Sequence, residues 1–149
     1  MSIAHMQDER GTGNEGASRT LELRLSRTHE LLVRRTGSPE WWSMLARNVE
    51  DLARAVEAHA EGCEVFHRQL LGDEPRLAFH ARSLERDHVE LTAELSELKA
   101  VVASSATQPS GLPIALAATT EAVARIRGHE RRAGQLLHEA VRRDLGGGG

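Results

Sequence analysis

Residues 45–70, LARNVEDLARAVEAHAEGCEVFHRQL, decide the fold class of this chain. Eight residues of the segment follow one another at steps that alternate four and three, which places them on one face of a helix. They are Leu45, Val49, Leu52, Val56, His59, Cys63, Phe66 and Leu70. This spacing is typical of an amphipathic helix packed at a shallow angle in a bundle. Few aromatic residues and much Ala, Leu, Glu and Arg also favour helix over sheet. We therefore predict an all-α protein.

The helix that contains this segment has a well-marked beginning. A first helix is predicted over residues 18–36, and its stripe is Leu21, Leu25, His29 and Leu32. Gly37 then stands where a helix commonly ends, Ser38 is a suitable N-cap, and Pro39 occupies the first position of the next helix. The second helix should run from here to about residue 71.

Two more helices follow the break at residues 72–75. The third has a stripe at Leu77, Ala81, Leu84, His88, Leu91, Leu95, Leu98 and Val102. A loop is predicted over residues 104–112, and a fourth helix begins near Pro113. Its stripe is Thr119, Ala122, Ile126, His129, Ala133, Leu136 and Ala140. We expect an antiparallel up-down-up-down four-helix bundle over residues 19–147, after a disordered tail at residues 1–18.

The composition excludes several classes of function. The net charge of −3, from 19 basic and 22 acidic residues, is not the basic excess that nucleic-acid binding requires. A single cysteine excludes a disulfide framework, and no apolar run of 18 residues could span a membrane. The N-terminus has no basic stretch followed by an apolar one, so we expect a cytoplasmic protein. One lysine against 18 arginines suggests a GC-rich bacterial genome.

Three histidines occupy stripe positions where a bundle ordinarily has leucine. His59 lies 13 residues before Gly72, and His88 lies 13 after Pro75. His88 also lies 16 residues before Ser104, and His129 lies 16 after Pro113. Since antiparallel helices keep register across a short connection, all three should reach one layer of the bundle. Converging neutral imidazoles suit zinc or another transition metal, whereas the alternative is a set of hydrogen-bonded core histidines.

The remaining histidines are expected to have lesser roles. His67, His80 and His138 should be solvated, because they lie off the main stripes. His29 lies on a stripe, but the register places it about 20 Å from the layer, so we interpret it as structural. Cys63, four residues after His59, faces the same way and could add a thiolate ligand, or it could simply pack as a small apolar residue.

Three segments carry a resemblance to a known family. EAHAEGCEVF around His59, PRLAFHARSLERDHVEL around His88 and GHERRAGQLLHEAVRRDLGG around His129 resemble the hemerythrin-like (HHE cation-binding) domain, in a poorly characterised bacterial branch. The resemblance covers residues 20–147. It implies a four-helix bundle in which histidines and bridging carboxylates hold a non-haem di-iron site. His59, His88 and His129 match ligand positions of the second, third and fourth helices, and His29 resembles the first-helix ligand in its spacing.

The chain departs from this family at the positions of the bridging carboxylates. Cys63 stands in place of a glutamate, Ala133 and Gly134 in place of an acidic residue, and Leu84 in place of a paired histidine. Glu64 is one residue out of phase, about 100° around the helix. Two ferric ions need anionic bridges, so the oxygen-carrying di-iron centre is not expected.

The sequence therefore predicts a degenerate hemerythrin-like bundle with at most one metal ion, iron or zinc. The ligands would be His59, His88 and His129, with Cys63 as the fourth. The alternatives are a metal-free scaffold that binds another protein, and a thiol-based redox sensor that uses Cys63. We expect no enzymatic activity, because no nucleophile–base pattern, phosphate loop or buried carboxylate pair is evident. A homo-oligomer and an unidentified protein partner both stay open, and neither a nucleic-acid nor a membrane partner is expected.

Overall fold

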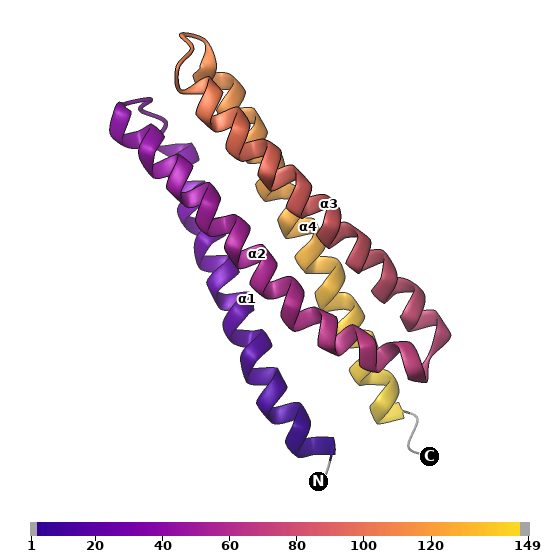
Figure 1. Cartoon of the computed structure of the whole chain (residues 1–149). Coiled ribbons are helices and arrows are strands. Elements are labelled where there is room, and N and C mark those ends of the chain that lie inside the picture. The colour runs from indigo at the N-terminus through magenta and orange to yellow at the C-terminus, as the bar shows by residue number, and fades with distance from the viewer. Residues whose placement is uncertain (1–2, 147–149) are drawn as a thin grey trace.

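The structure is a computed structural model that describes the backbone of residues 3–146 and the side chains of residues 16–65, 67–68, 74–140 and 142. The described residues form four helices, which are α1 (Ile3–Val33), α2 (Pro39–Asp73), α3 (Pro75–Ser105) and α4 (Gly111–Gly146). Contacts join α1 to α2, α2 to α3 and α3 to α4, and α1 and α4 close the ring more loosely. The chain runs up, down, up and down, as predicted (Figure 1).

The boundary between α1 and α2 confirms the predicted signals. Gly37 has a φ of +67°, a left-handed conformation that glycine adopts without strain. Ser38 Oγ accepts a hydrogen bond from the backbone N–H of Trp41 at 3.2 Å, which caps α2. The indole N–H of Trp41 donates to the carbonyl of Leu31 at 2.9 Å. The cap and the indole bond together turn the chain at this end of the bundle.

The α3–α4 loop is shorter than predicted. α3 continues to Ser105 and α4 begins at Gly111, so Pro113 lies in the first turn of α4. The backbone N–H of Gly111 donates to the carbonyl of Gln108 at 3.1 Å. A Cβ atom at Gly111 would lie 1.8 Å from the carbonyl oxygen of Ser105. Only glycine permits so close an approach of the two helix ends.

The first helix differs most from its prediction. α1 begins at Ile3 and is continuous through Ser18, where the sequence predicted a boundary. Residues 1–2 and 147–149 lie outside the described residues, as do the side chains of residues 3–15. The division of the chain into an N-terminal tail and a bundle therefore stays a prediction. The buried face of α1 is Leu21, Leu25, Thr28 and Leu31. The predicted stripe leaves this face, because two successive steps of four residues rotate the position by about 80° around the helix axis. His29 is therefore exposed.

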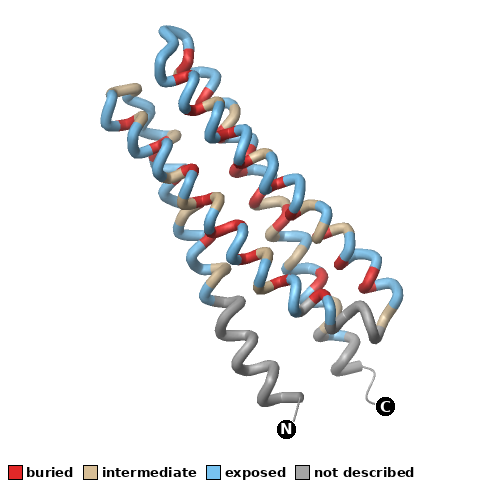
Figure 2. Tube along the Cα trace, viewed as in Figure 1, coloured by how far each residue is buried: buried red, intermediate tan, exposed pale blue. Residues whose placement is uncertain are grey.

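Most of the core lies near the α1–α2 turn and the α3–α4 loop. This apolar half of the bundle draws on all four helices and contains Leu21, Leu25, Leu31, Trp41, Leu45, Val49, Leu52, Ala55, Val56, Leu91, Leu95, Leu98, Val102, Ala115, Ala122, Val123 and Ile126. The buried positions follow the sides of the helices that face one another (Figure 2). A smaller cluster of Leu77, Ala81, Leu84 and Leu136 lies toward the α2–α3 turn. None of the described helices is long and apolar enough to cross a membrane.

Candidate functional site

Between the two apolar clusters, four of the histidines whose side chains are described are buried in one region of the bundle. His59 and His67 come from α2, His88 from α3 and His129 from α4, and their exposed fractions are 4%, 2%, 8% and 2%. The ring centroids of His59 and His88 are 6.2 Å apart, and those of His88 and His129 are 4.3 Å apart. The structure therefore brings together the three histidines that the sequence placed in one layer, and it adds a fourth. We call these four residues and Cys63 the histidine cluster.

His88 and His129 are in direct contact through their ring nitrogens. The two Nε2 atoms are 2.6 Å apart, so one of them donates a hydrogen bond and the other accepts it. Burial, reinforced by the charges of His129, His59 and His67, lowers the pKa of His88 to about 4. Burial also lowers the pKa of His129. Both rings are therefore neutral near pH 7, which is the form in which an imidazole binds a metal.

His59 lies beside a carboxylate and a thiol. Its Nε2 atom is 2.7 Å from Glu130 Oε1 and 3.4 Å from Cys63 Sγ, and its Nδ1 atom is 3.5 Å from Ser18 Oγ. Burial alone would lower the pKa of His59, but the contacts with Cys63 and Glu130 outweigh it and raise the pKa to about 10. Cys63 itself is 6% exposed. One ring nitrogen, one sulfur and one carboxylate oxygen thus meet inside the bundle.

The prediction that His67 is solvated was wrong. His67 stacks against His88, with ring centroids 6.4 Å apart and an interplanar angle of 16°. Its Nδ1 atom is 3.8 Å from Glu85 Oε1, and burial lowers the pKa of the ring despite this carboxylate. The buried face of α2 continues from Cys63 by a step of four rather than three, which carries it to His67. His80 and His138 are exposed, as predicted.

Two carboxylates of the site were missed by the sequence reasoning. Glu130 follows His129 on α4 and reaches His59 on α2, and Asp87 precedes His88 on α3 and approaches His129 on α4. Residues four or five positions from each histidine share its helix face, and neither Glu130 nor Asp87 is at such a position. A residue adjacent to a core histidine points about 100° away and can face a histidine on the next helix. An acidic residue directly beside a core histidine, as in Asp87-His88 and His129-Glu130, was the sequence signal that could have identified these two carboxylates. Glu64, judged out of phase, is indeed exposed.

A metal ion bound here would require the donor atoms to move from the positions that they have in the structure. Two nitrogen ligands of a tetrahedral zinc ion lie about 3.3 Å apart, whereas the Nε2 atoms of His88 and His129 are 2.6 Å apart. Among the described residues, no group of three or more His, Cys, Asp or Glu side chains is arranged to hold a metal. However, His129 Nδ1 and Glu130 Oε1 are buried without a well-aligned hydrogen bond. Each of these two atoms has a polar neighbour, since His59 Nε2 lies 2.7 Å from Glu130 Oε1 and Asp87 Oδ2 lies 3.5 Å from His129 Nδ1.

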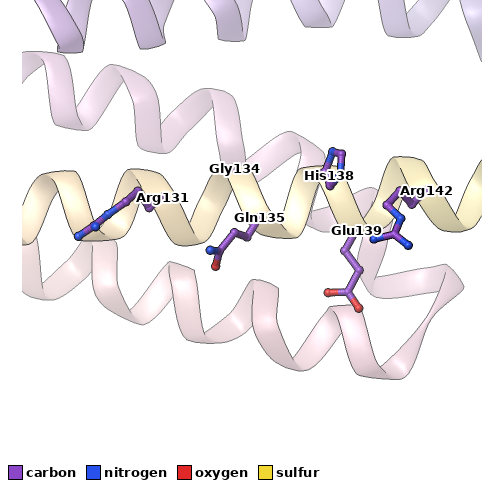
Figure 3. A pocket seen from close by; sticks show the side chains of 6 residues that line it. All are labelled: Arg131, Gly134, Gln135, His138, Glu139 and Arg142. Carbon is purple, nitrogen blue, oxygen red and sulfur yellow. The ribbon is translucent and has the colours of Figure 1, made fainter.

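A separate hollow lies on the surface of α4. It is lined by Arg131, Gly134, Gln135, His138, Glu139 and Arg142, which all come from this one helix (Figure 3). Its lining includes none of the buried histidines. The hollow is therefore distinct from the histidine cluster, which remains the candidate functional site.

Comparison with known proteins identifies no relative. The chain matches no protein-family model, no curated protein and no solved structure.

Proposed function

We propose that this four-helix bundle binds a single divalent metal ion, zinc or iron(II), within the histidine cluster. The observation that carries the proposal is the meeting of donor atoms from three helices. His59 Nε2 lies 2.7 Å from Glu130 Oε1 and 3.4 Å from Cys63 Sγ, beside the contacting Nε2 atoms of His88 and His129. The ligands would come from His59, His88, His129 and Cys63, with Glu130 as a further donor. His59, whose pKa is raised to about 10 without metal, would release its proton when the ion binds.

The types of donor support this choice of metal. Imidazole nitrogens, a thiolate and a carboxylate are the ligands that zinc and ferrous iron accept in proteins. A thiolate at Cys63 and the carboxylate of Glu130 would together balance the charge of a divalent ion, which neutral imidazoles cannot do. A metal bound here would supply a Lewis-acid centre inside an otherwise apolar bundle.

A single ion agrees better with this site than a di-iron centre. The resemblance to hemerythrin-like domains would imply two irons with bridging carboxylates, but Cys63, Ala133 and Gly134 stand at those positions. Glu130 is one carboxylate, and its nearer oxygen is directed to His59. We therefore propose a degenerate hemerythrin-like bundle that binds one metal ion and does not carry oxygen.

Metal binding can be tested directly on the full chain, purified without a histidine tag and stripped of metal. Zn²⁺ should bind with a stoichiometry of one in competition with a chromophoric chelator. It should also raise the free energy of unfolding by about 2.7 kcal/mol when free zinc is a hundredfold above Kd, because it binds only the folded state. His129→Ala should abolish both effects.

The matched control is His138→Ala, which removes an exposed histidine from the same helix. It should bind zinc like the unmodified chain. Equal zinc binding by the His129→Ala variant, or no zinc or iron binding by the unmodified chain, would refute the proposal.

A second candidate function is a thiol-based redox sensor, and the contact between Cys63 Sγ and His59 Nε2 favours it. An adjacent imidazolium promotes the reactive thiolate form of a cysteine. The rate at which a disulfide reagent labels Cys63 distinguishes the two candidates. Rapid labelling of the metal-free protein that zinc does not slow would favour the sensor, whereas protection by zinc would favour the metal site.

A further inference from the structure

Asp87 lies between a surface arginine and the buried ring of His129. Its Oδ2 atom is 2.8 Å from Arg132 and 3.5 Å from His129 Nδ1. The side chain of Asp87 is 25% exposed, whereas that of His129 is 2% exposed. His129 Nδ1 is buried without a well-aligned hydrogen bond, so the carboxylate is an acceptor beside a buried nitrogen whose hydrogen bond is otherwise unmade.

This arrangement bears on which nitrogen of each ring carries the proton. A carboxylate only accepts hydrogen bonds, so Asp87 favours the proton of His129 on Nδ1. The lone pair of His129 then lies on Nε2, which faces His88 Nε2 at 2.6 Å. Two lone pairs cannot face each other at this distance, so His88 must carry its proton on Nε2. The two rings are thus expected in opposite tautomers when no metal is bound.

We propose that Asp87 is a positioning residue for the metal site, holding His129 as the Nδ1–H tautomer with the Nε2 lone pair directed into the cluster. This inference rests on the proposed metal binding. Arg132 holds the carboxylate in place from the solvent side. Metal-binding histidines generally donate their other ring N–H to such a partner, which fixes both the tautomer and the orientation of the ring.

The tautomers can be measured in the metal-free protein without any substitution. In long-range ¹H–¹⁵N spectra of histidine-labelled chain, with resonances assigned from the His129→Gln variant, His129 should show the proton on Nδ1 and His88 on Nε2. The Asp87→Asn variant should lose this preference at His129, because an amide can donate as well as accept. A proton on Nε2 of His129 in the unmodified chain would overturn the proposal.

Metal affinity supplies the second measurement. Asp87→Asn should weaken zinc binding 10- to 100-fold, the usual effect of removing such a partner. The matched control is Glu85→Gln, which removes a carboxylate on the same helix that lies near His67 instead, 3.8 Å from its Nδ1 atom. The control should change zinc affinity less than about threefold.

The two proposals fail in different ways. If the unmodified chain binds no metal but His129 shows the Nδ1 proton, the metal function fails and the role of Asp87 in orienting the ring stands. If zinc binds and Asp87→Asn binds it as tightly as the unmodified chain does, the metal function stands and the role of Asp87 fails. Should Asp87→Asn not fold, the tautomer of the unmodified chain still decides.

Discussion

In the apolar half of the bundle, Leu25, Leu45, Val49 and Leu52 are completely buried against other apolar side chains. In the histidine cluster, residues on the same helix faces are also buried, with exposed fractions of 2% to 8%, but they present ring nitrogens and a sulfur to one another. Burial of apolar surface stabilises the fold directly, whereas a buried polar group contributes little even when it is paired. The apolar half therefore supplies most of the free energy of folding, whereas the histidine cluster adds little to it or lowers it.

The largest expected effect tests the first half of this comparison. Leu52→Ala should lower the free energy of unfolding by about 3 kcal/mol, because it removes a fully buried side chain and leaves a cavity. Urea denaturation measures the change. The control is Leu137→Ala, at a position that is 41% exposed, where the loss should stay below about 0.5 kcal/mol. Equal losses at the two positions would contradict the assignment of stability to the apolar half.

An effect of intermediate size is the dependence of the free energy of unfolding on pH. The pKa of His88 is about 4 in the folded protein, below its ordinary 6.5, so on acidification the unfolded state takes up a proton first. Without metal, this residue should reduce the free energy of unfolding by about 2 kcal/mol between pH 7 and pH 5. His59 has the opposite sign, since its pKa is raised to about 10: its contribution is complete below pH 6.5 and is lost as the pH rises toward 10.

Denaturation in the presence of a chelator, at a series of pH values, measures this dependence. Carboxylates also titrate in the acid range, so the informative quantity is the difference between the unmodified chain and His88→Leu. The variant should lose about 2 kcal/mol less than the unmodified chain between pH 7 and pH 5. Parallel pH curves for the two proteins would show that His88 is not protected from protonation in the fold.

The smallest effect tests the second half of the comparison. Replacement of both His88 and His129 by Leu should raise the free energy of unfolding of the metal-free protein by about 1 kcal/mol, because it removes two buried polar rings together. The single variant His129→Leu should instead be destabilised, since it leaves His88 Nε2 buried without its partner. Urea denaturation of the three proteins provides the measurement, and a destabilised double variant would show that the histidine pair supports the fold.

Much of the fold could be predicted from the sequence. The stripe of α3 is buried at every predicted position, and Gly37, Ser38 and Pro39 mark the start of α2 as expected. These features depend on local rules of helix period and capping, which act within one helix. The stripe of α1 was misplaced because His29 and Leu32 offered an alternative period, and only packing against α2 and α4 selects Thr28 and Leu31.

The candidate site was predictable only in part. His59, His88 and His129 could be brought to one layer by counting residues from the turns, because helix rise is uniform. His67 was missed because the seam of α2 changes its step after Cys63. Glu130 and Asp87 were missed because each is directed to a histidine on a different helix, which no spacing within one helix reports.

The sequence by itself determined the all-helical class, the turns on either side of α2 and the depth at which three histidines would meet, since each follows from period, capping and rise along one chain. Only the tertiary structure decided which atoms face one another within that depth. Whether Nε2 of His59 lies against Cys63 and Glu130, or His129 against Asp87, depends on how each helix is rotated about its own axis. That rotation is set by the packing of all four helices together. It brings the ring nitrogens, the sulfur and the carboxylates of different helices into contact within the layer.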